Sequence, residues 1–272
     1  MMGPSVVRNL VCTGLVFAVL GLSGCTGLDR YNSQAATETL GVSGTVKLNV
    51  LNPAGSVTVT GWDQNQVSVT YTKHVNVWRS WWMPAPAPES YFEQMTITLT
   101  ATADGANLNA TLPPESWPHN MWATIDLDIK IPEGGALNVD LDAGNVTVSN
   151  VAGGATVALD AGSAALTGVS GGINVDVDAG NIDVIHDAPL ENTETIECTV
   201  DAGNIDLWVP EGSSFELDAG LNVGGMTVDN DFPGLEVERI GLTGAQCQGT
   251  TGSGGATITL HVSTGNIDVR AQ

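Results

Sequence analysis

A short phrase, Asp-Ala-Gly, recurs along the second half of this chain and constrains its fold more than any other feature. Its copies begin at Asp142, Asp160, Asp178, Asp201 and Asp218. The first three aspartates stand 18 residues apart, and a fixed period of this size is typical of architectures in which each repeat stacks on the one before it. An altered copy, Ser263-Thr264-Gly265, lies near the C-terminus.

The residues on both sides of the phrase alternate between apolar and polar. Positions one and three before the aspartate are apolar, and so, in nearly every copy, are positions two and four after the glycine. A period of two is typical of β-strands with one buried face. Glycine suits the turn because a sharp turn needs a positive φ. We predict an all-β fold, a parallel β-solenoid in which each coil holds two short strands joined at Asp-Ala-Gly.

In such a solenoid, equivalent residues of neighbouring coils lie about 4.8 Å apart. The apolar positions then form a continuous core, and one polar position predicts a ladder of stacked amides. That ladder consists of Asn145, Asn181, Asn204 and Asn266. A β-sandwich of repeated hairpins is the structural alternative. The solenoid is favoured because identical residues recur in one register.

The period divides the chain and also marks its interruptions. Residues 136–272 contain the regular repeats, and residues 44–135 are predicted to form degenerate N-terminal coils in which Gly55 takes the place of Gly144. The interval from Asp178 to Asp201 holds five extra residues. The segment 224–254 is expected to cover the end of the last coil, because an open end would expose unpaired strand edges.

The N-terminus has the features of a targeting segment. Arg8 precedes an apolar run, 10–22, that is too short to span a bilayer comfortably. Leu22-Ser23-Gly24-Cys25 then resembles the lipobox of bacterial lipoproteins. The resemblance implies that residues 1–24 are a lipoprotein signal peptide and that Cys25 carries a covalent lipid such as palmitate. An ordinary secretory signal with a chance cysteine is the alternative.

A lipid on Cys25 predicts a location in the cell envelope, anchored to a membrane. Thr26 stands where an aspartate would resemble an inner-membrane retention signal, so the outer membrane is expected if the organism is Gram-negative. Residues 25–43 are polar and lack alternation. We predict that they form a flexible tether between the lipid and the domain at 44–272.

The charge limits the possible partners. Without residues 1–24 the formal charge is 7 − 30 = −23, which excludes nucleic acid and disfavours anionic lipid surfaces. It suits an envelope protein with basic patches, or a bound cation. An exported protein lies in an oxidising compartment, which favours a disulfide between Cys198 and Cys247. The alternative is that Cys198 is a small buried apolar residue.

The repeated aspartates form a candidate calcium site. Calcium takes oxygen ligands, and stacking would place Asp142, Asp160, Asp178, Asp201 and Asp218 in one column. Turn capping by these side chains is the favoured interpretation, because the nonapeptide calcium-binding repeat is absent. A calcium-stabilised envelope module remains an alternative. No other metal or cofactor is expected, since the histidines lack metal-ligand spacing.

An enzyme is the main alternative to a binding or scaffolding module. Elongated β-helices can host polysaccharide hydrolases or lyases, and carboxylates are abundant here. The repeat alone explains those carboxylates, however, and residues 136–272 contain only Arg239 and Arg270 as basic groups. The sequence has no serine or cysteine nucleophile motif. We therefore expect no catalytic residues.

A tryptophan-rich segment is the best candidate for specificity. Its aromatic side chains, with two further ones nearby, are Trp78, Trp81, Trp82, Tyr91 and Trp117. They suit binding to a glycan or to a protein partner, because aromatic groups give a large contact area at a low entropic cost. A place in the membrane headgroup region is a second interpretation. The favoured interpretation is a hydrophobic cap over the N-terminal end of the solenoid.

Several motifs together resemble the bacterial putative-adhesin family. They are the lipobox, the strand ending at Ile131-Pro132, the serial Asp-x-Gly-Asn-Ile-x-Val phrases and the terminal Ser263-Thr264-Gly265-Asn266-Ile267-Asp268-Val269. The similarity covers about residues 44–270. It implies a β-solenoid domain of unknown function in the envelope and supplies no catalytic residues. The chain departs from the family in using Asp-Ala-Gly and in its tryptophan-rich segment.

Overall fold

The computed structural model describes residues 26–33, 35–44, 46–80, 89–113, 120–190 and 192–272. Within these residues the protein is nearly all β, with sixteen strands and the four-residue helix α1 (Glu89–Phe92). In chain order the strands are β1 (Thr26–Asn32), β2 (Ala36–Gly41), β3 (Lys47–Ala54), β4 (Val57–Trp62), β5 (Gln66–Ser80), β6 (Thr96–Ala101), β7 (Gly105–Thr111), β8 (Met121–Pro132), β9 (Ala136–Ser149), β10 (Ala155–Thr167), β11 (Ile173–Ile185), β12 (Thr195–Val209), β13 (Phe215–Val228), β14 (Val237–Ile240), β15 (Gly244–Thr251) and β16 (Ala256–Ala271). No helix among the described residues is long and apolar enough to cross a membrane.

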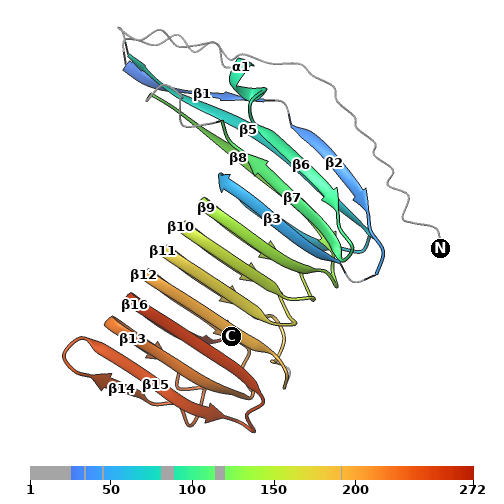
Figure 1. Ribbon diagram of the computed structural model, residues 1–272. Helices are drawn as coiled ribbons and strands as arrows, with labels where there is room; N and C mark the ends of the chain where they lie inside the picture. The colour runs from blue at the N-terminus through green and yellow to red at the C-terminus, as the bar shows by residue number, and fades with distance from the viewer. Residues whose placement is uncertain (1–25, 34, 45, 81–88, 114–119, 191) are drawn as a thin grey trace.

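The body of the molecule is a parallel β-solenoid, as the repeats predict. Strands β9, β10, β11 and β12 pair in parallel in chain order, and they stack like the rungs of a ladder (Figure 1). Leu137 of β9 pairs with Ala155 of β10, which pairs with Ile173 of β11, so each coil advances by 18 residues. Each coil contributes one long strand that bends at Asp-Ala-Gly, where the sequence predicted two short strands.

The bend requires glycine for two reasons. Gly144, Gly162 and Gly180 have φ between 142° and 154°, and residues with a Cβ atom rarely adopt such values. A Cβ added at Gly180 would also overlap the carbonyl oxygen of Gly162 in the coil below, and the same holds for Gly162 over Gly144. The glycines therefore form a column in which backbone lies directly on backbone.

The amide ladder next to this column is present for Asn181, Asn204 and Asn266, but Ser163 lies between Asn145 and Asn181, so Asn145 is outside the ladder. Asn266 donates from Nδ2 to Oδ1 of Asn204 at 2.9 Å, and Asn204 donates in the same way to Asn181 at 2.9 Å. The Oδ1 atoms also accept backbone N–H groups of the next coil, as Asn145 does from Ser163 at 3.2 Å. The ladder thus satisfies backbone donors at the bend and fixes the register.

The core is a set of apolar rows that cross the strands. One row contains Val50, Val139, Val157 and Val175, each at most 2% exposed, and a second row follows the bend with Val146, Ala164, Ile182 and Ile205, all 0% exposed. Because each row continues from coil to coil, burial is shared by neighbouring repeats. No coil buries its apolar face alone.

The order of the last coils differs from the chain order. Strand β16 lies between β12 and β13, pairing in parallel with both. Gly224, with φ 147°, stacks on Gly265, so the predicted corner at Asp218-Ala219-Gly220 is wrong. The bend lies at Gly224, four residues after the predicted Gly220. An even shift keeps the same side chains facing inward, so the alternation in the sequence does not reveal the error.

Antiparallel strands close both ends of the solenoid. At the C-terminal end, β15 pairs with β13 and β14 pairs with β15, both antiparallel. The segment 224–254 therefore covers the end of the stack, as predicted. Strand β14 has only four residues, and a short edge strand with charged residues resists pairing with other chains.

The N-terminal part begins as predicted and then departs from the prediction. Strands β3 and β4 form a coil on β9, with Ala54 opposite Ala143 and Gly55 at the bend. Strands β7 and β8 add one more parallel layer. Strands β5 and β6, however, run antiparallel to β8 and β7. The prediction of serial coils across 44–135 is therefore wrong for these two strands, because alternation shows that a strand exists and not which way it runs.

The predicted tether is also wrong for most of its length. Residues Thr26–Asn32 form β1 and residues Ala36–Gly41 form β2, and both pair antiparallel with β5. Strand β5 has 15 residues, and it offers β1 and β2 an edge that satisfies their backbone hydrogen bonds. Polar strands of this kind are stabilised by their partner rather than by their own apolar pattern.

The five extra residues between β11 and β12 are fixed by a buried polar pair. His186 and Glu194 are 5% and 7% exposed, with Nε2 of the histidine 3.5 Å from Oε1 of the glutamate. Gln272 donates from Nε2 to the carbonyl of His186 at 2.6 Å. The insertion thus ties the C-terminus to the solenoid.

The predicted disulfide is wrong. Cys198 and Cys247 are both free and buried. They lie in one row across four strands, in the order Cys198, Leu260, Ala219 and Cys247. Three strand spacings amount to about 14 Å, whereas a disulfide needs Cα atoms within about 7 Å. The second interpretation of Cys198, a small buried apolar side chain, fits this position.

The glycine column predicts a large and local sensitivity to substitution. Gly180→Ala should lower the free energy of unfolding by about 3 kcal/mol or more, because backbone must move and φ is positive. Gly134→Ala is the matched control, since nothing lies within 4 Å of its added Cβ. Urea unfolding followed by circular dichroism measures both. Equal stability of the two variants would contradict the role of the column.

The free cysteines predict thiols that are present but unreactive. Burial raises the pKa of Cys198 to about 12 and also raises that of Cys247. A thiol reagent should therefore label neither cysteine in the folded domain at pH 8 and both in denaturant. Dithiothreitol should leave the melting temperature unchanged. A mass lower by two hydrogens under non-reducing conditions would show a disulfide instead.

Candidate functional site

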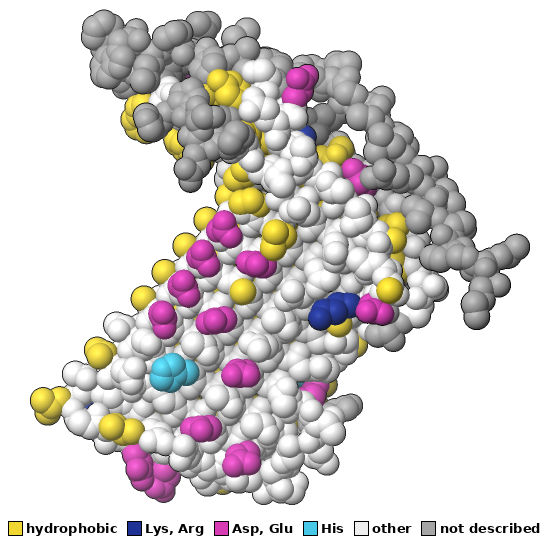
Figure 2. Space-filling model, in the orientation of Figure 1, with side chains coloured by type: hydrophobic (Ala, Val, Ile, Leu, Met, Phe, Trp, Pro, Cys, Tyr) yellow, Lys and Arg dark blue, Asp and Glu magenta, His cyan; other side chains and the backbone are white. Residues whose placement is uncertain are grey.

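Before the bend, the solenoid presents columns of acidic side chains to solvent. We call Asp142, Asp160, Asp178 and Asp201 the aspartate column; all four are exposed. Asp140 and Asp176 lie two residues before it on the same face, and Figure 2 shows acidic side chains in columns that cross the strands. Charges at this stacking distance repel by about 1 kcal/mol in water. The face is therefore a fixed array of negative charge.

The geometry removes Asp218 from the predicted column of calcium ligands. Asp218 pairs with Thr259 of β16, so it lies four residues away from the aspartate column. The position of the column in β16 is occupied by Ser263, which donates from Oγ to Oδ1 of Asp201 at 3.3 Å. Among the residues that the structure describes, no group of three or more His, Cys, Asp or Glu is placed to hold a metal ion.

After the bend, a second acidic row carries its own counter-ion. Asp183, Asp206 and Asp268 are cross-strand neighbours in β11, β12 and β16. Arg270 contacts Oδ1 of Asp206 at 3.1 Å and Oδ2 of Asp268 at 3.2 Å, and its guanidinium lies 4.9 Å from the ring centre of Trp208. Burial and Asp206 raise the pKa of Asp183, against the effect of Arg270. This row is partly neutralised, whereas the aspartate column is not.

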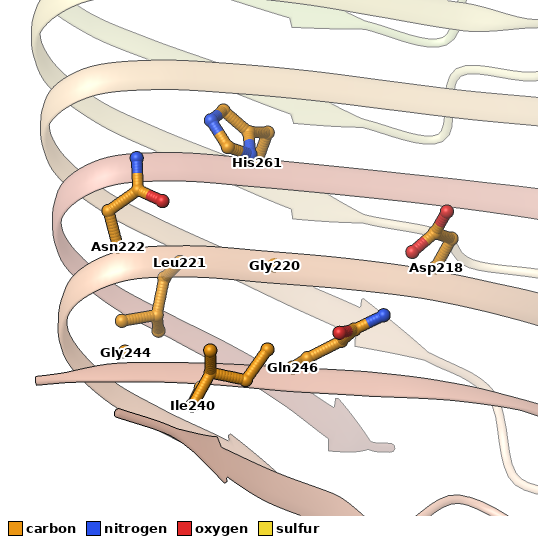
Figure 3. Close-up of a pocket in the computed structure, with 9 residues that line it drawn as sticks. Asp218, Gly220, Leu221, Asn222, Ile240, Gly244, Gln246 and His261 are labelled. Atoms are coloured by element: carbon orange, nitrogen blue, oxygen red, sulfur yellow. The ribbon is translucent and has the colours of Figure 1, made fainter. Parts of the chain in front are cut away.

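A small pocket lies where the C-terminal antiparallel strands meet the last coils. It has a volume of about 220 Å³, and its polar lining includes Asp218, Gln246 and His261. Leu221 and Ile240 supply apolar surface (Figure 3). Asp218 is already engaged, because it accepts a hydrogen bond from Nε2 of Gln248 at 2.8 Å. Ligand sites usually measure about 300–1,000 Å³, so this pocket suits at most a small group.

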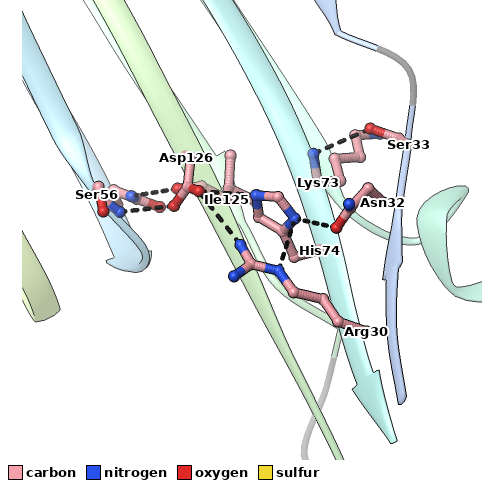
Figure 4. A network of polar contacts seen from close by, with 9 residues as sticks. Arg30, Asn32, Ser33, Ser56, Lys73, His74, Ile125 and Asp126 are labelled. Atoms are coloured by element: carbon pink, nitrogen blue, oxygen red, sulfur yellow. Dashed lines mark hydrogen bonds and ion pairs between the residues drawn. The ribbon is translucent and has the colours of Figure 1, made fainter.

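The N-terminal sheet contains a polar network around a buried histidine. His74, 6% exposed, lies 2.7 Å by Nε2 from Oδ2 of Asp126, and its Nδ1 accepts from Nε of Arg30 at 3.3 Å (Figure 4). Oδ1 of the Asn32 side chain lies 2.6 Å from Nδ1. Asp126 also accepts the backbone N–H of Ser56 at 2.9 Å. The network fastens β1 to β5 and β8.

Burial has the largest effect on the pKa of His74. It lowers the pKa of His74, and Arg30 adds to the effect, while Asp126 opposes it. The neutral imidazole is therefore favoured in the folded protein relative to a free histidine. No motif in the sequence indicates this site, because its members come from three segments.

The aromatic residues expected to bind a partner differ in their exposure, and only some of them are described by the structure. Trp78 is 54% exposed on β5, so it is not the buried cap that the sequence favoured. Tyr91 of α1 is partly buried and packs against the core. Trp81, Trp82 and Trp117 lie outside the described residues, as does Cys25. On the strands beside Trp78, the structure also exposes two apolar residues that the sequence did not single out, Leu28 at 51% and Trp122 at 44%.

Comparison with known proteins identifies a family and several similar structures. A family model described as Toastrack DUF4097 matches residues 123–270, more than half of the chain. A solved structure of a putative cell adhesion protein from Clostridium sporogenes is 11% identical, with 88% of this chain and 100% of that chain covered and a TM-score of 0.44. A putative adhesin from Bacteroides fragilis is 12% identical, with 87% and 97% covered and a TM-score of 0.44. No curated protein matches the sequence.

The polar network predicts a stability that falls on mild acidification. The folded pKa of His74 is below that of the unfolded chain, so the unfolded state binds the proton first as the pH drops through about 6.5. Between pH 7.5 and 5 the unsubstituted protein should lose more of its free energy of unfolding than the His74→Gln variant does. The control is His261→Gln, which changes an exposed histidine. Urea unfolding at the two pH values measures this, and parallel losses in all three proteins would contradict the assignment.

Proposed function

The chain belongs to the Toastrack DUF4097 family, and on that premise we propose that it is a non-catalytic binding module of the cell envelope, held to a membrane by a lipid on Cys25. In this proposal the aspartate column and its flanking acids bind the basic surface of an envelope protein partner. Adhesion to another surface is one use of such a module. A scaffolding role within the envelope is another.

The observation that carries the proposal is the regularity of the acidic face. Asp142, Asp160, Asp178 and Asp201 occupy one position of four successive coils in the stack, and all are exposed. The glycine bend and the amide ladder beside them fix the backbone, so the charges need little ordering when a partner binds. A rigid periodic array suits a large charged surface rather than a small substrate.

The same regularity argues against an enzyme. A carboxylate pair that acts as acid and base needs two different environments, which push the two pKa values apart. The members of the aspartate column are all exposed to solvent, and Asp201 also accepts a hydrogen bond from Ser263, so none has the buried setting of a catalytic acid. Where the structure describes a pocket with a carboxylate and a histidine together, the carboxylate is Asp218, and Gln248 already binds it.

The distribution of charge supports a basic partner. Residues 136–272 contain two basic and twenty acidic side chains, a formal charge of −18. Residues 26–135 contain five basic and ten acidic side chains, a formal charge of −5. A single-sign field of this kind accelerates association with a basic surface and weakens with salt. The acidic half extends away from β1, which contains the first described residue (Figure 1).

The acidic face predicts position-dependent binding of a basic probe. Replacing Asp142, Asp160, Asp178 and Asp201 by Asn should weaken binding of a decalysine peptide about tenfold at about 50 mM salt, by removing the continuous charge array. Fluorescence anisotropy of a labelled peptide measures the affinity, and a thermal melt checks that the variant folds.

The matched control removes the same charge elsewhere on the surface. It carries Asp63→Asn, Asp104→Asn, Asp187→Asn and Glu211→Gln, four exposed sites outside the column. It should weaken binding less than about threefold. Equal weakening by both variants would show that only net charge matters and would remove the aspartate column as a binding face.

A further inference from the structure

Three large apolar side chains form an exposed patch on the outer face of the N-terminal sheet. They are Leu28 on β1, Trp78 on β5 and Trp122 on β8, with exposed fractions of 51%, 54% and 44%. In an antiparallel sheet, directly opposite residues share a face. Leu28 lies opposite Trp78, and Trp122 lies opposite Asn76, two residues before Trp78. All three side chains are therefore on one face, and we call them the tryptophan patch.

The patch is contiguous. A directly opposite pair has Cβ atoms about 5 Å apart, and a diagonal pair lies within about 8 Å, which tryptophan side chains can bridge. The next residues along the same face are polar, with Arg30 opposite Asn76 and then His74 and Asp126. Arg30 is half exposed, with a side-chain exposure of 53%. The surface thus passes from aromatic to cationic and polar within a few residues.

The patch lies at the point where the chain leaves the sheet toward its N-terminus. Strand β1 begins at Thr26, whose backbone pairs with Ser80 at the end of β5. Leu28 follows Cys25 by three residues, so their Cα atoms are at most about 10 Å apart. Any lipid on Cys25 therefore holds Leu28 within about 10 Å of the lipidated residue, close to a headgroup layer of about 5–8 Å.

The distribution of charge favours an orientation in which the tryptophan patch faces the membrane. The acidic half, with its formal charge of −18, is the part repelled by a negatively charged membrane surface. The half that contains the patch has most of the basic residues after Cys25. Tryptophan favours the boundary between lipid and water, where its ring is apolar and its N–H is wet.

We propose that the tryptophan patch is a second membrane contact, in which Leu28, Trp78 and Trp122 enter the headgroup region and hold the solenoid with its acidic half away from the bilayer. The proposal rests on the lipid anchor at Cys25 from the proposed function. An anchor at one residue holds the chain at a single point, so a second contact fixes the orientation of the domain. The anchor alone would leave the domain free to rotate.

A fluorophore at the patch tests the proposal. Leu28→Cys and Leu242→Cys are each labelled with an environment-sensitive dye; Leu242 is 98% exposed at the opposite end of the molecule and is the matched control. Cys198 and Cys247 are buried and stay unlabelled in the folded protein. The mature full chain is reconstituted into phosphatidylcholine vesicles, and quenching of the dye by aqueous iodide is measured.

The dye at position 28 should become about threefold less accessible to iodide on reconstitution, because the headgroup region excludes the aqueous anion, and the dye at position 242 should not change. Adding Trp78→Thr and Trp122→Thr to Leu28→Cys should restore most of the accessibility, with a thermal melt to confirm folding. If that variant does not fold, Trp122→Thr alone is compared. An unchanged accessibility at position 28 on reconstitution overturns the proposal.

Two further outcomes separate this proposal from the others. Protection of position 28 in whole cells but not in vesicles identifies a protein partner on the patch and overturns the membrane contact. A mass spectrum without lipid on Cys25 removes the anchor and not the patch. In that case the soluble chain is mixed with vesicles, and protection of position 28 still supports a membrane-binding patch.

Discussion

The close stacking of glycine on glycine at the bend is the contact on which the rest of this structure depends. Each bend places the backbone of one coil against the carbonyl of the next, as Gly162 does on Gly144 and Gly265 does on Gly203. No side chain fits between them, so the coils stack in one register. The alternating side chains then fall into rows. Apolar rows become the core, and polar rows become the two outer faces.

In-register stacking brings like charges together, and the protein handles them in two ways. After the bend, Arg270 bridges Asp206 and Asp268 and covers Trp208. Before the bend, the aspartate column stays in solvent, where water screens the repulsion. A periodic surface of uncompensated charge is the feature most available to a partner, and it is a direct product of the repeat.

A stacked sheet must also end, and the two ends differ in chemistry. At the C-terminal end, β15 and β14 cover the last coil and finish in a short charged edge. At the N-terminal end, β5, β6, β1 and β2 close the stack, and the outer face of β1, β5 and β8 carries the tryptophan patch beside the network of His74. The molecule is therefore acidic along its body and aromatic near the first described residue.

The sequence by itself determined the repeat and the structural consequences of its period. The alternation identified the strands of the repeats, the 18-residue spacing identified the coil, and Gly55 identified the first bend, because each is a local consequence of backbone geometry. The stacked asparagines are a result of the same register. Tertiary structure decided the order and direction of strands, and with them the candidate sites. A strand has the same alternation whether it runs parallel or antiparallel. The sequence therefore could not show the direction of β5 and β6, or that β16 inserts between β12 and β13.

The distance between Cys198 and Cys247 depends on that strand order, and so does the surface near the N-terminus. Leu28, Trp78 and Trp122 come from three separate segments, and only the pairing of β1, β5 and β8 places them on one face. Local periodicity therefore predicted the coil and its bend, whereas contacts between distant segments, which leave no periodic trace in the sequence, decided where the exposed aromatic groups meet.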